Sequence, residues 1–441
     1  NNLYGVDIMD EAVEICKLRL FLKLVAQVEP GQEIEPLPDI DFNVRAGNTL
    51  VGFVRLDEVQ HALTTEPSGQ MLLLDAEAER QLRRIAEEAE IAARAYDEFH
   101  RQQVLGKGAI TARDKADLRA RLGRLNEELN RTLARQYGVD PDALSYAPWL
   151  ASHKPFHWLV DFYGIMQQGG FDVIIGNPPY VVYSRAKVPY QLEPQGFTTY
   201  RTGNLYAFVF ERSTQLGSQH SRIGLIVQLS ALSSNRMETL QGTLLQRGTL
   251  FALPFPRRPK SVFDGTEMPV AIILSLPAMH SVYITSATKR FYTSERDTAL
   301  RDLAFVQHGI RDRDSRIAKI GSPLQRSIIE KVQGHVKVLE TLTANAGKWT
   351  VYYQEACRYW AKARYGSPHF RRDGIAIPPP HGRYIHFRSE NAAAFAACLM
   401  NSSLFYFCYS VFCDCEHVND SFVRSFHIPN AWSLAPWEAM I

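Results

Sequence analysis

Three short apolar runs constrain the fold of this chain more than any other feature. They span residues 172–175, 223–227 and 269–274, and each is apolar on what would be both faces of a strand. Strands of this kind are covered on both sides, which is typical of parallel strands inside an α/β sheet. We therefore expect the three runs to be buried parallel strands of one sheet.

Helices are expected between the strands. A strand from Leu3 to Ile8 leads through Asp10, a candidate N-cap, into a helix with four apolar residues on one face. These residues are Val13, Cys16, Leu20 and Leu24. A second helix is expected from about Leu205 to Leu216. Alternating strands and helices predict an open α/β sheet, whose ligands bind at the carboxyl ends of the strands.

A charged segment between Asp75 and Arg135 interrupts this alternation. It contains 12 acidic and 13 basic residues, has apolar residues at helical spacing, and is broken once at residues 106–108. The pattern predicts an antiparallel hairpin of two helices with solvated charged faces, inserted in the α/β domain.

The chain as a whole carries little net charge, but part of it is strongly basic. The 441 residues have a formal charge of +2, which neither indicates nor excludes a nucleic-acid partner. Residues 301–388 contain 16 Lys or Arg and seven Asp or Glu, and so carry +9. Six aromatic residues between Tyr352 and Phe370 lie among these cations. Such a composition suits contact with phosphates and stacking on bases.

The motif Asn177-Pro178-Pro179-Tyr180 directly follows the first buried run and Gly176. An exocyclic amine such as N6 of adenine is a poor nucleophile, because its lone pair is delocalised into the ring. Two acceptors aimed at its hydrogens, the Asn177 side-chain oxygen and the Pro178 carbonyl, would draw the nitrogen toward a nucleophilic geometry. Proline fixes the loop, and Tyr180 offers a face on which a planar base can stack. A base held in this way must leave the duplex, so the motif implies base flipping.

With this motif the chain resembles the amino-directed DNA methyltransferases that use S-adenosyl-L-methionine. It is similar in particular to the long adenine-N6 methylases of bacterial restriction-modification and phage-defence systems. Residues 171–181 resemble the family's catalytic stretch, which makes the tetrad 177–180 the catalytic candidate. Residues 261–265 resemble the motif that gives a second aromatic side chain to the flipped base, here Phe263. The resemblance implies double-stranded DNA as the partner.

Two further matches concern the cofactor. Residues 5–8 resemble the family's second motif, so Asp7 would accept hydrogen bonds from the cofactor ribose and Ile8 would pack on its adenine ring. Residues 47–50 resemble the motif whose polar residue contacts that adenine, with Asn48 where the family often has Asp.

The sequence also departs from the family pattern. Asn204 replaces the commoner Asp before the helix at 205–216, and Gln228 stands where the family usually has Pro. The family's Gly-rich loop, which approaches the methionine part of the cofactor, would fall upstream of Asn1. We therefore expect a piece of a longer polypeptide, cut inside a sheet, that binds S-adenosylmethionine weakly or not at all by itself.

The resemblance implies an α/β fold: a partial Rossmann-like methyltransferase domain with a helical insertion, followed by a C-terminal α+β domain that recognises the DNA target. We expect the first part of the catalytic domain at 1–54 and the helical hairpin at 55–150. The second part of the catalytic domain, with the tetrad, is expected at 151–290, and the target-recognition domain at 291–441.

Other interpretations stay open on the sequence alone. The tetrad could serve cytosine N4 or a protein glutamine amide, could be a relic in a non-catalytic DNA-binding subunit, or could be a rigid turn. No metal is expected, because methyl transfer needs none and the cysteines at 398, 408, 413 and 415 fit no standard zinc spacing and read as buried thiols. If the full polypeptide also cuts DNA, its nuclease domain is expected outside the segment; whether it carries a nuclease or acts with other subunits of the same system stays open. No signal peptide or apolar run of about 18 residues is found, which favours a cytoplasmic protein without a membrane span.

Overall fold

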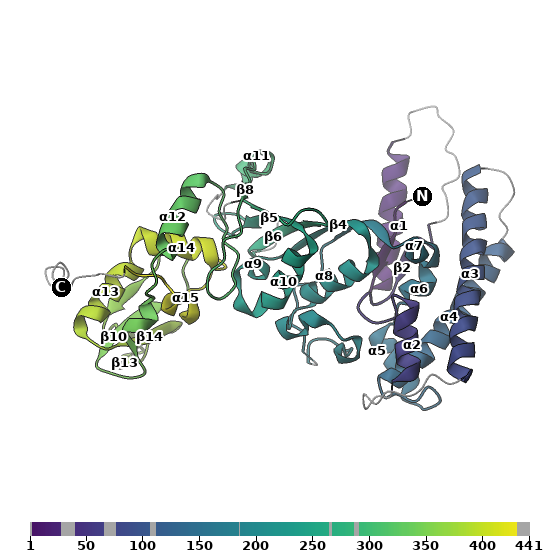
Figure 1. Cartoon of the computed structure of the whole chain (residues 1–441), viewed down its shortest axis with the longest axis horizontal. Helices are drawn as coiled ribbons and strands as arrows, with labels where there is room; N and C mark the ends of the chain where they lie inside the picture. Colours follow the sequence, from purple (N-terminus) through teal and green to yellow (C-terminus); the bar gives the residue numbers. More distant parts are fainter. Residues whose placement is uncertain are drawn as a thin grey trace. The chain divides into compact units, whose positions relative to one another are not determined.

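The computed structural model describes residues 2–27, 40–65, 76–105, 112–184, 186–263, 267–285 and 291–429 (Figure 1). The chain divides into two compact units. Unit 1 consists of Asn1–Ile174 and Val181–Ser221, and unit 2 consists of Ile175–Tyr180 and Arg222–Ile441. The tetrad therefore belongs to unit 2, although the residues directly before and after the segment 175–180 belong to unit 1.

Unit 1 begins with two short parallel strands, β1 (Gly5–Asp7) and β2 (Val44–Ala46), with Asp7 opposite Ala46. The remaining elements of unit 1 are mainly helices. They are α1 (Asp10–Val25), α2 (Leu56–Thr64), α3 (Ala76–Leu105), α4 (Ala112–Gln136), α5 (Tyr146–His153), α6 (Trp158–Asp161), α7 (Tyr163–Gln167) and α8 (Leu205–Leu216), with two 3-10 turns at Glu193–Gln195 and Thr198–Thr202. The helix predicted at 205–216 is thus confirmed.

The helix expected after the first strand is confirmed as α1, but the expected N-cap is wrong. Met9 occupies the N-cap, and Asp10 is the first helical residue, with its carboxylate 2.8 Å from the Lys154 ammonium. Of the four apolar residues expected on one face, Val13 is buried, Leu20 is half-buried, and Cys16 and Leu24 are exposed. The reason is that α1 packs mainly on β1 and β2, whose short ladder covers little of a helix of 16 residues.

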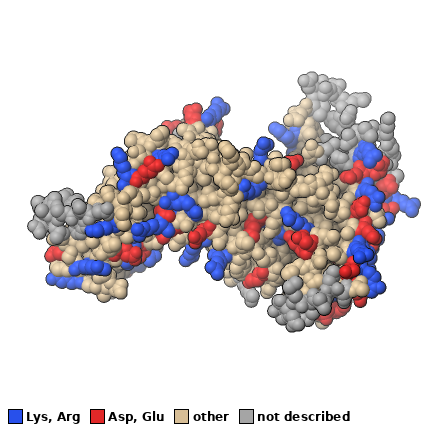
Figure 2. All heavy atoms as spheres, in the orientation of Figure 1, with Lys and Arg blue, Asp and Glu red and all other residues tan. Residues whose placement is uncertain are grey.

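The predicted helical hairpin is confirmed by α3 and α4, which pack against each other. Ile85 and Ala89 of α3 and Leu125 and Leu129 of α4 belong to one buried core cluster. Figure 2 shows acidic and basic side chains interleaved along the outer side of these helices, as expected for solvated faces. The break predicted at 106–108 lies outside the described residues.

His157 makes unit 1 sensitive to acid. Its ring is 1% exposed, and its Nδ1 accepts a hydrogen bond from the Phe53 backbone N–H at 3.2 Å, so the folded state needs the neutral ring. Burial lowers the pKa of His157 to about 3, from an ordinary value of 6.5. Below pH 6.5 the unfolded chain therefore binds a proton that the folded chain does not.

We expect this histidine to lower the free energy of unfolding as the pH falls from about 6.5 toward 3. The loss from this group at pH 5 should be ~2 kcal/mol relative to neutral pH. Urea denaturation at pH 7 and pH 5 measures the loss, and His157→Gln, which has no titrating ring, should reduce it. An equally steep loss in that variant would contradict the assignment.

A six-stranded sheet has the order β3-β4-β6-β5-β7-β8 and lies mainly in unit 2, whereas residues 171–174 of β3 and 217–221 of β4 are counted with unit 1. Its strands are β3 (Phe171–Gly176), β4 (Gly217–Gln228), β5 (Thr249–Phe255), β6 (Val270–Leu276), β7 (Val282–Ile284) and β8 (Val306–Gln307). Helices α9 (Ser230–Ser233), α10 (Glu238–Arg247) and α11 (Arg296–Arg301) accompany it.

Two of the three strand predictions need correction. The runs at 223–227 and 269–274 do form β4 and β6, but β6 lies between β4 and β5 and is antiparallel to both. A central strand is buried on both faces whichever way it runs, so the apolar pattern does not encode its direction. The run at 172–175 forms most of the edge strand β3, but Val173 and Ile175 are 58% and 78% exposed: alternate residues share a face, and the described residues leave this face of β3 largely uncovered, whereas Ile174 on the other face packs on a buried cluster.

The C-terminal part of unit 2 combines an antiparallel sheet with helices around its own buried cluster. The sheet has the order β11-β10-β14-β9, and β12 pairs separately with β13. The strands are β9 (Thr343–Ala344), β10 (Trp349–Gln354), β11 (Ala363–Tyr365), β12 (Arg371–Arg372), β13 (Ile375–Ala376) and β14 (Gly382–Phe387). The helices are α12 (Pro323–Gln333), α13 (Glu390–Met400), α14 (Ser403–Phe412) and α15 (Asp420–Arg424).

None of the described helices is by itself long and apolar enough to cross a membrane; α13 and α14 meet that criterion only when joined across their 67° bend.

Candidate active site

The tetrad lies at the carboxyl end of β3. Gly176, the last strand residue, approaches the next strand so closely that an added Cβ would lie 3.2 Å from the Leu225 side chain. Asn177 and Pro179 are exposed, whereas Pro178 is buried. Asn177 is thus exposed to solvent, and the loop that carries it is restrained at the next residue, because Pro178 is buried and its ring fixes the backbone φ.

Tyr180 ties this loop to the neighbouring strand. Its hydroxyl lies 3.0 Å from the Asn177 Oδ1 and 3.2 Å from the Ile226 carbonyl of β4. The hydroxyl has one proton and can donate it to one of these two oxygens at a time. Burial raises the pKa of Tyr180, which keeps the hydroxyl protonated and able to donate.

The two aromatic residues predicted to contact a base meet at one apolar cluster. Tyr180 and Phe263 both pack, half-buried, against the same set of buried side chains in unit 2. These side chains are Leu253, Phe255, Val262, Val270 and Phe291. Asp264 and Gly265, which completed the sequence match around Phe263, lie outside the described residues.

The residues predicted to bind the cofactor lie in unit 1, at the carboxyl ends of β1 and β2. These strands are parallel neighbours, so their carboxyl ends share one edge, which is where α/β sheets bind ligands. Asp7 ends β1 with an exposed carboxylate, one oxygen of which accepts a hydrogen bond from the Met9 N–H at 2.8 Å. Ile8 is half-buried and packs on the core of unit 1.

Asn48 follows β2 and contains an unsatisfied donor. The residue is 3% exposed, and its Oδ1 accepts a hydrogen bond from the Leu50 N–H at 3.1 Å. Its Nδ2 is buried and has no hydrogen-bond partner among the described residues. Because an unpaired buried donor costs about 1–3 kcal/mol, such a group is suited to bind a ligand acceptor.

Two residues that support these motifs were not predicted. Lys154 has a left-handed backbone (φ 44°), and its ammonium donates to the Ile8 carbonyl at 3.2 Å and to Asp10. Glu211, buried in α8, accepts four hydrogen bonds from the N–H and hydroxyl groups of Thr198 and Thr199. Nothing near Lys154 in the sequence signals its role, because its partners lie more than 140 residues away.

The cysteine-rich segment forms no metal site within the described residues. No group of three or more His, Cys, Asp and Glu side chains in that part of the chain could hold a metal ion. Cys408, Cys413 and Cys415 are buried free thiols, as predicted, and Cys398 is half-buried. Burial raises the pKa of Cys408 to about 12, which keeps this thiol protonated and unreactive.

The sequence match to a known family covers the tetrad and the cofactor motifs and ends before residues 261–265. Residues 1–253, more than half of the chain, match the family of Eco57I restriction-modification methylases. The chain belongs to this family. The resemblance inferred from the motifs is confirmed at the level of restriction-modification methylases.

The relatives include a protein of Methanocaldococcus jannaschii described as a type II restriction enzyme and methyltransferase. It is 27% identical over 311 residues, which cover 62% of this chain and 26% of the relative. The chain therefore spans about a quarter of this relative's length. Among solved structures, the ATP-dependent Type ISP restriction-modification enzyme LlaBIII bound to DNA is 12% identical with a TM-score of 0.31, covering 78% of this chain and 26% of that one. The type IIG restriction endonuclease BpuSI is 12% identical with a TM-score of 0.25, covering 62% and 36%.

Proposed function

We propose that this chain is the catalytic and DNA-recognition part of a methyltransferase. It transfers a methyl group from S-adenosyl-L-methionine to N6 of an adenine flipped out of duplex DNA, in a restriction-modification or phage-defence system. The observation that carries this proposal is the Asn177 Oδ1, a solvent-facing acceptor on a proline-fixed loop beside the half-buried ring of Tyr180.

The tetrad and its surroundings suit a planar base that carries an amine. The flipped adenine stacks against Tyr180 and contacts Phe263, since both rings pack on one apolar cluster. Its N6 donates one hydrogen to the Asn177 Oδ1 and the other to the Pro178 carbonyl. The Tyr180 hydroxyl then donates to the Ile226 carbonyl, the other acceptor within its reach at 3.2 Å, and so releases the Asn177 oxygen for the base.

The cofactor-motif residues of unit 1 fit S-adenosylmethionine, which supplies an electrophilic methyl group when bound. The exposed Asp7 carboxylate accepts hydrogen bonds from the ribose hydroxyls, as an acid at the end of a β strand can do. The unpaired Asn48 Nδ2 donates to a ring nitrogen of the cofactor's adenine. Ile8 contacts the face of that ring.

Duplex DNA is the partner that the charge distribution favours. Residues 301–388 carry +9, and a polyanion is the ligand that such a field attracts most strongly. This charge also argues against a protein glutamine as the methyl acceptor, because that reaction needs no extended basic surface. We propose that residues 291–441 act as the target-recognition domain.

Mass spectrometry of nucleosides tests the proposed function. The full-length protein that contains this chain is incubated with duplex DNA and isotope-labelled cofactor, and the DNA is then digested to nucleosides. Labelled N6-methyladenine is the expected product. Labelled N4-methylcytosine would move the target to cytosine, and label in protein glutamine alone would move it out of DNA. Unlabelled DNA that is nevertheless bound would identify a non-catalytic DNA-binding subunit.

A further inference from the structure

The hairpin formed by β12 and β13 is exposed along its whole length. All six residues from 371 to 376 are exposed, and Arg371 lies opposite Ala376 in the ladder, with Arg372 opposite Ile375. The two turn residues, Asp373 and Gly374, have φ of 52° and 81°. Two positive φ values are the mark of a type I′ turn, whose twist matches that of paired strands. The segment is therefore a regular two-stranded ribbon.

The ribbon is connected at its base to the four-stranded sheet. The chain leaves the sheet after β11 and returns to it as β14, and these two strands flank β10 on opposite sides. The Ile377 N–H donates to the Phe370 carbonyl at 3.1 Å, which extends the ladder toward the base. Figure 1 shows β13 at the lower edge of the C-terminal part of unit 2. The ribbon therefore projects from the four-stranded sheet.

The charges on and around the ribbon are mainly positive. Residues 343–388 contain eight Lys or Arg but only two acids, Glu355 and Asp373, and Glu355 is already paired with Arg383. The Arg371 and Arg372 side chains make no hydrogen bond or ion pair with any residue that the structure describes. Basic side chains are also visible over this part of the molecule in Figure 2. Both guanidinium groups are therefore available to an external anion.

An apolar side chain shares the ribbon with these cations. Ile375 is 67% exposed and lies on the same face as Arg372, because cross-strand partners point to the same side. A binding partner that offers both anionic groups and apolar contacts could bind Arg372 and Ile375 at the same time. The major groove of DNA does so, with its phosphates, its base-edge acceptors and its thymine methyl groups.

We propose that the ribbon 371–376 enters the major groove of duplex DNA, with Arg371 and Arg372 on phosphates and base edges and Ile375 against the bases. This inference rests on the proposed function, in which DNA is the partner. The dimensions agree, since paired strands lie about 4.8 Å apart and the groove, about 12 Å wide, admits a two-stranded ribbon.

Binding of the 441-residue chain to a fluorescent duplex of mixed sequence, followed by anisotropy over a range of salt concentrations, tests the charged contacts. Arg371→Ala with Arg372→Ala should lower duplex affinity at least about tenfold and reduce the slope of log affinity against log salt by about 1.8. Arg83→Ala with Arg94→Ala removes the same charge from exposed positions on α3 and should leave affinity within about twofold. The proposal is overturned if the ribbon variant binds like the wild type, or if the chain binds no duplex at low salt.

Two uncharged changes separate groove insertion from attraction to the backbone alone. Ile375→Ala should weaken duplex binding about fivefold without changing the salt slope, because it removes apolar burial only. Asp373→Asn keeps a residue that tolerates the positive φ and removes the one acid of the ribbon, so it should tighten binding. Wild-type affinity of Ile375→Ala, or equal losses on single-stranded DNA, would show that the ribbon does not enter a groove.

The failure of this inference can be told from the failure of the proposed function. Methylated DNA together with ribbon variants that bind normally would refute the ribbon and leave the methyltransferase standing. Weakened duplex binding by the ribbon variants, without any methylated nucleoside, would refute the methyltransferase and leave the ribbon as a DNA contact.

Discussion

Replacing Asn177 by alanine in the complete protein is expected to lower the rate of DNA methylation about 10³-fold, the size of effect seen when a group that positions a proton or a developing charge is removed. The change deletes one of the two acceptors that orient the target amine. Duplex affinity should stay within twofold of the wild type, because the basic segment at 301–388 is unaltered. Single-turnover transfer of labelled methyl to DNA gives the rate, and anisotropy of a labelled duplex gives the affinity.

Two conservative variants serve as controls for this prediction. Asn177→Asp keeps an acceptor oxygen at the same place and should retain much of the rate. Tyr180→Phe keeps the ring that stacks on the base but lacks the hydroxyl that lies 3.0 Å from the Asn177 Oδ1, so its rate should fall less than about tenfold. An Asn177→Ala enzyme with more than a tenth of the wild-type rate would refute the assigned role.

The parts of the fold that the sequence predicted well depend on local patterns. The helix at 205–216 and the α3–α4 hairpin were readable because apolar residues at helical spacing mark the buried face within one segment. The tetrad could also be recognised from a local pattern, because its four residues and the strand before them are contiguous in the chain.

The errors concern properties that depend on neighbours in space. The direction of β6 is set by the strands on either side of it, and the exposure of Val173 and Ile175 in β3 by what packs on the face to which they point. The residues of a strand determine neither its direction in the sheet nor the exposure of its side chains. Periodicity predicted the helix α1 and the four apolar residues on one of its faces, but how much of that face is covered depends on its neighbours, and of the four only Val13 is buried.

In the candidate site, too, local sequence patterns were predicted and contacts between neighbours in space were not. Asn177, Tyr180, Asp7 and Asn48 were found through motifs, but the contacts that give them chemical meaning were not. The hydroxyl of Tyr180 near the Asn177 oxygen and the unpaired Nδ2 of Asn48 follow from the folded structure and not from the motifs. The contacts of Lys154 with Ile8 and Asp10, and the hydrogen bond between Arg316 and Ser421, join residues that are distant in sequence, and no single-sequence pattern marks them.

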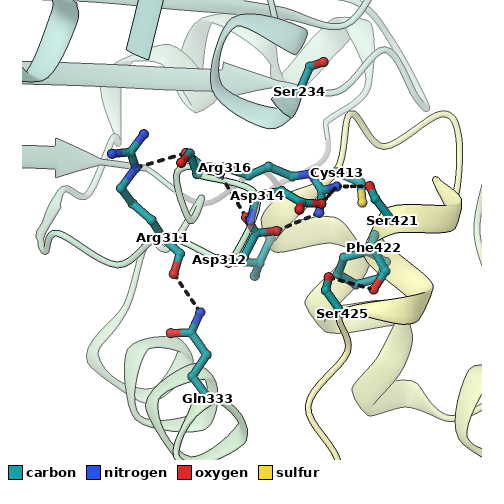
Figure 3. A network of polar contacts seen from close by, with 12 residues as sticks. Ser234, Arg311, Asp312, Asp314, Arg316, Gln333, Cys413, Ser421, Phe422 and Ser425 are labelled. Atoms are coloured by element: carbon teal, nitrogen blue, oxygen red, sulfur yellow. Dashed lines mark hydrogen bonds and ion pairs between the residues drawn. The ribbon is translucent and has the colours of Figure 1, made fainter. Parts of the chain in front are cut away.

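The buried charges of unit 2 centre on Arg316 (Figure 3). Its side chain is 1% exposed and forms ion pairs with Asp312 and Asp314, which come from the same turn, and a hydrogen bond with Ser421 of α15. The backbone on either side is fixed as well: the Ile317 N–H donates to the Leu232 carbonyl of α9, and the Lys319 N–H donates to the Val411 carbonyl of α14. The turn therefore joins the region of the six-stranded sheet to the C-terminal helices within unit 2.

Replacing Arg316 by alanine should lower the free energy of unfolding of unit 2 by about 3–5 kcal/mol, the cost of removing one partner from a buried ion pair. The change leaves the carboxylates of Asp312 and Asp314, 10% and 25% exposed, without their cation. Urea denaturation, with hydrogen exchange measured on peptides of unit 2, gives the size and place of the loss. Arg313→Ala, an exposed arginine of the same turn, should cost less than about 1 kcal/mol.

A neutral version of the network shows whether the uncompensated charge is the cause. Arg316→Met with Asp312→Asn and Asp314→Asn removes the cation and both carboxylates together, so it should recover at least half of the stability lost in Arg316→Ala. If the triple variant is as unstable as Arg316→Ala, the loss comes from the packing of the arginine side chain against Phe422, whose ring centre lies 6.0 Å from the guanidinium carbon, and the electrostatic explanation is wrong.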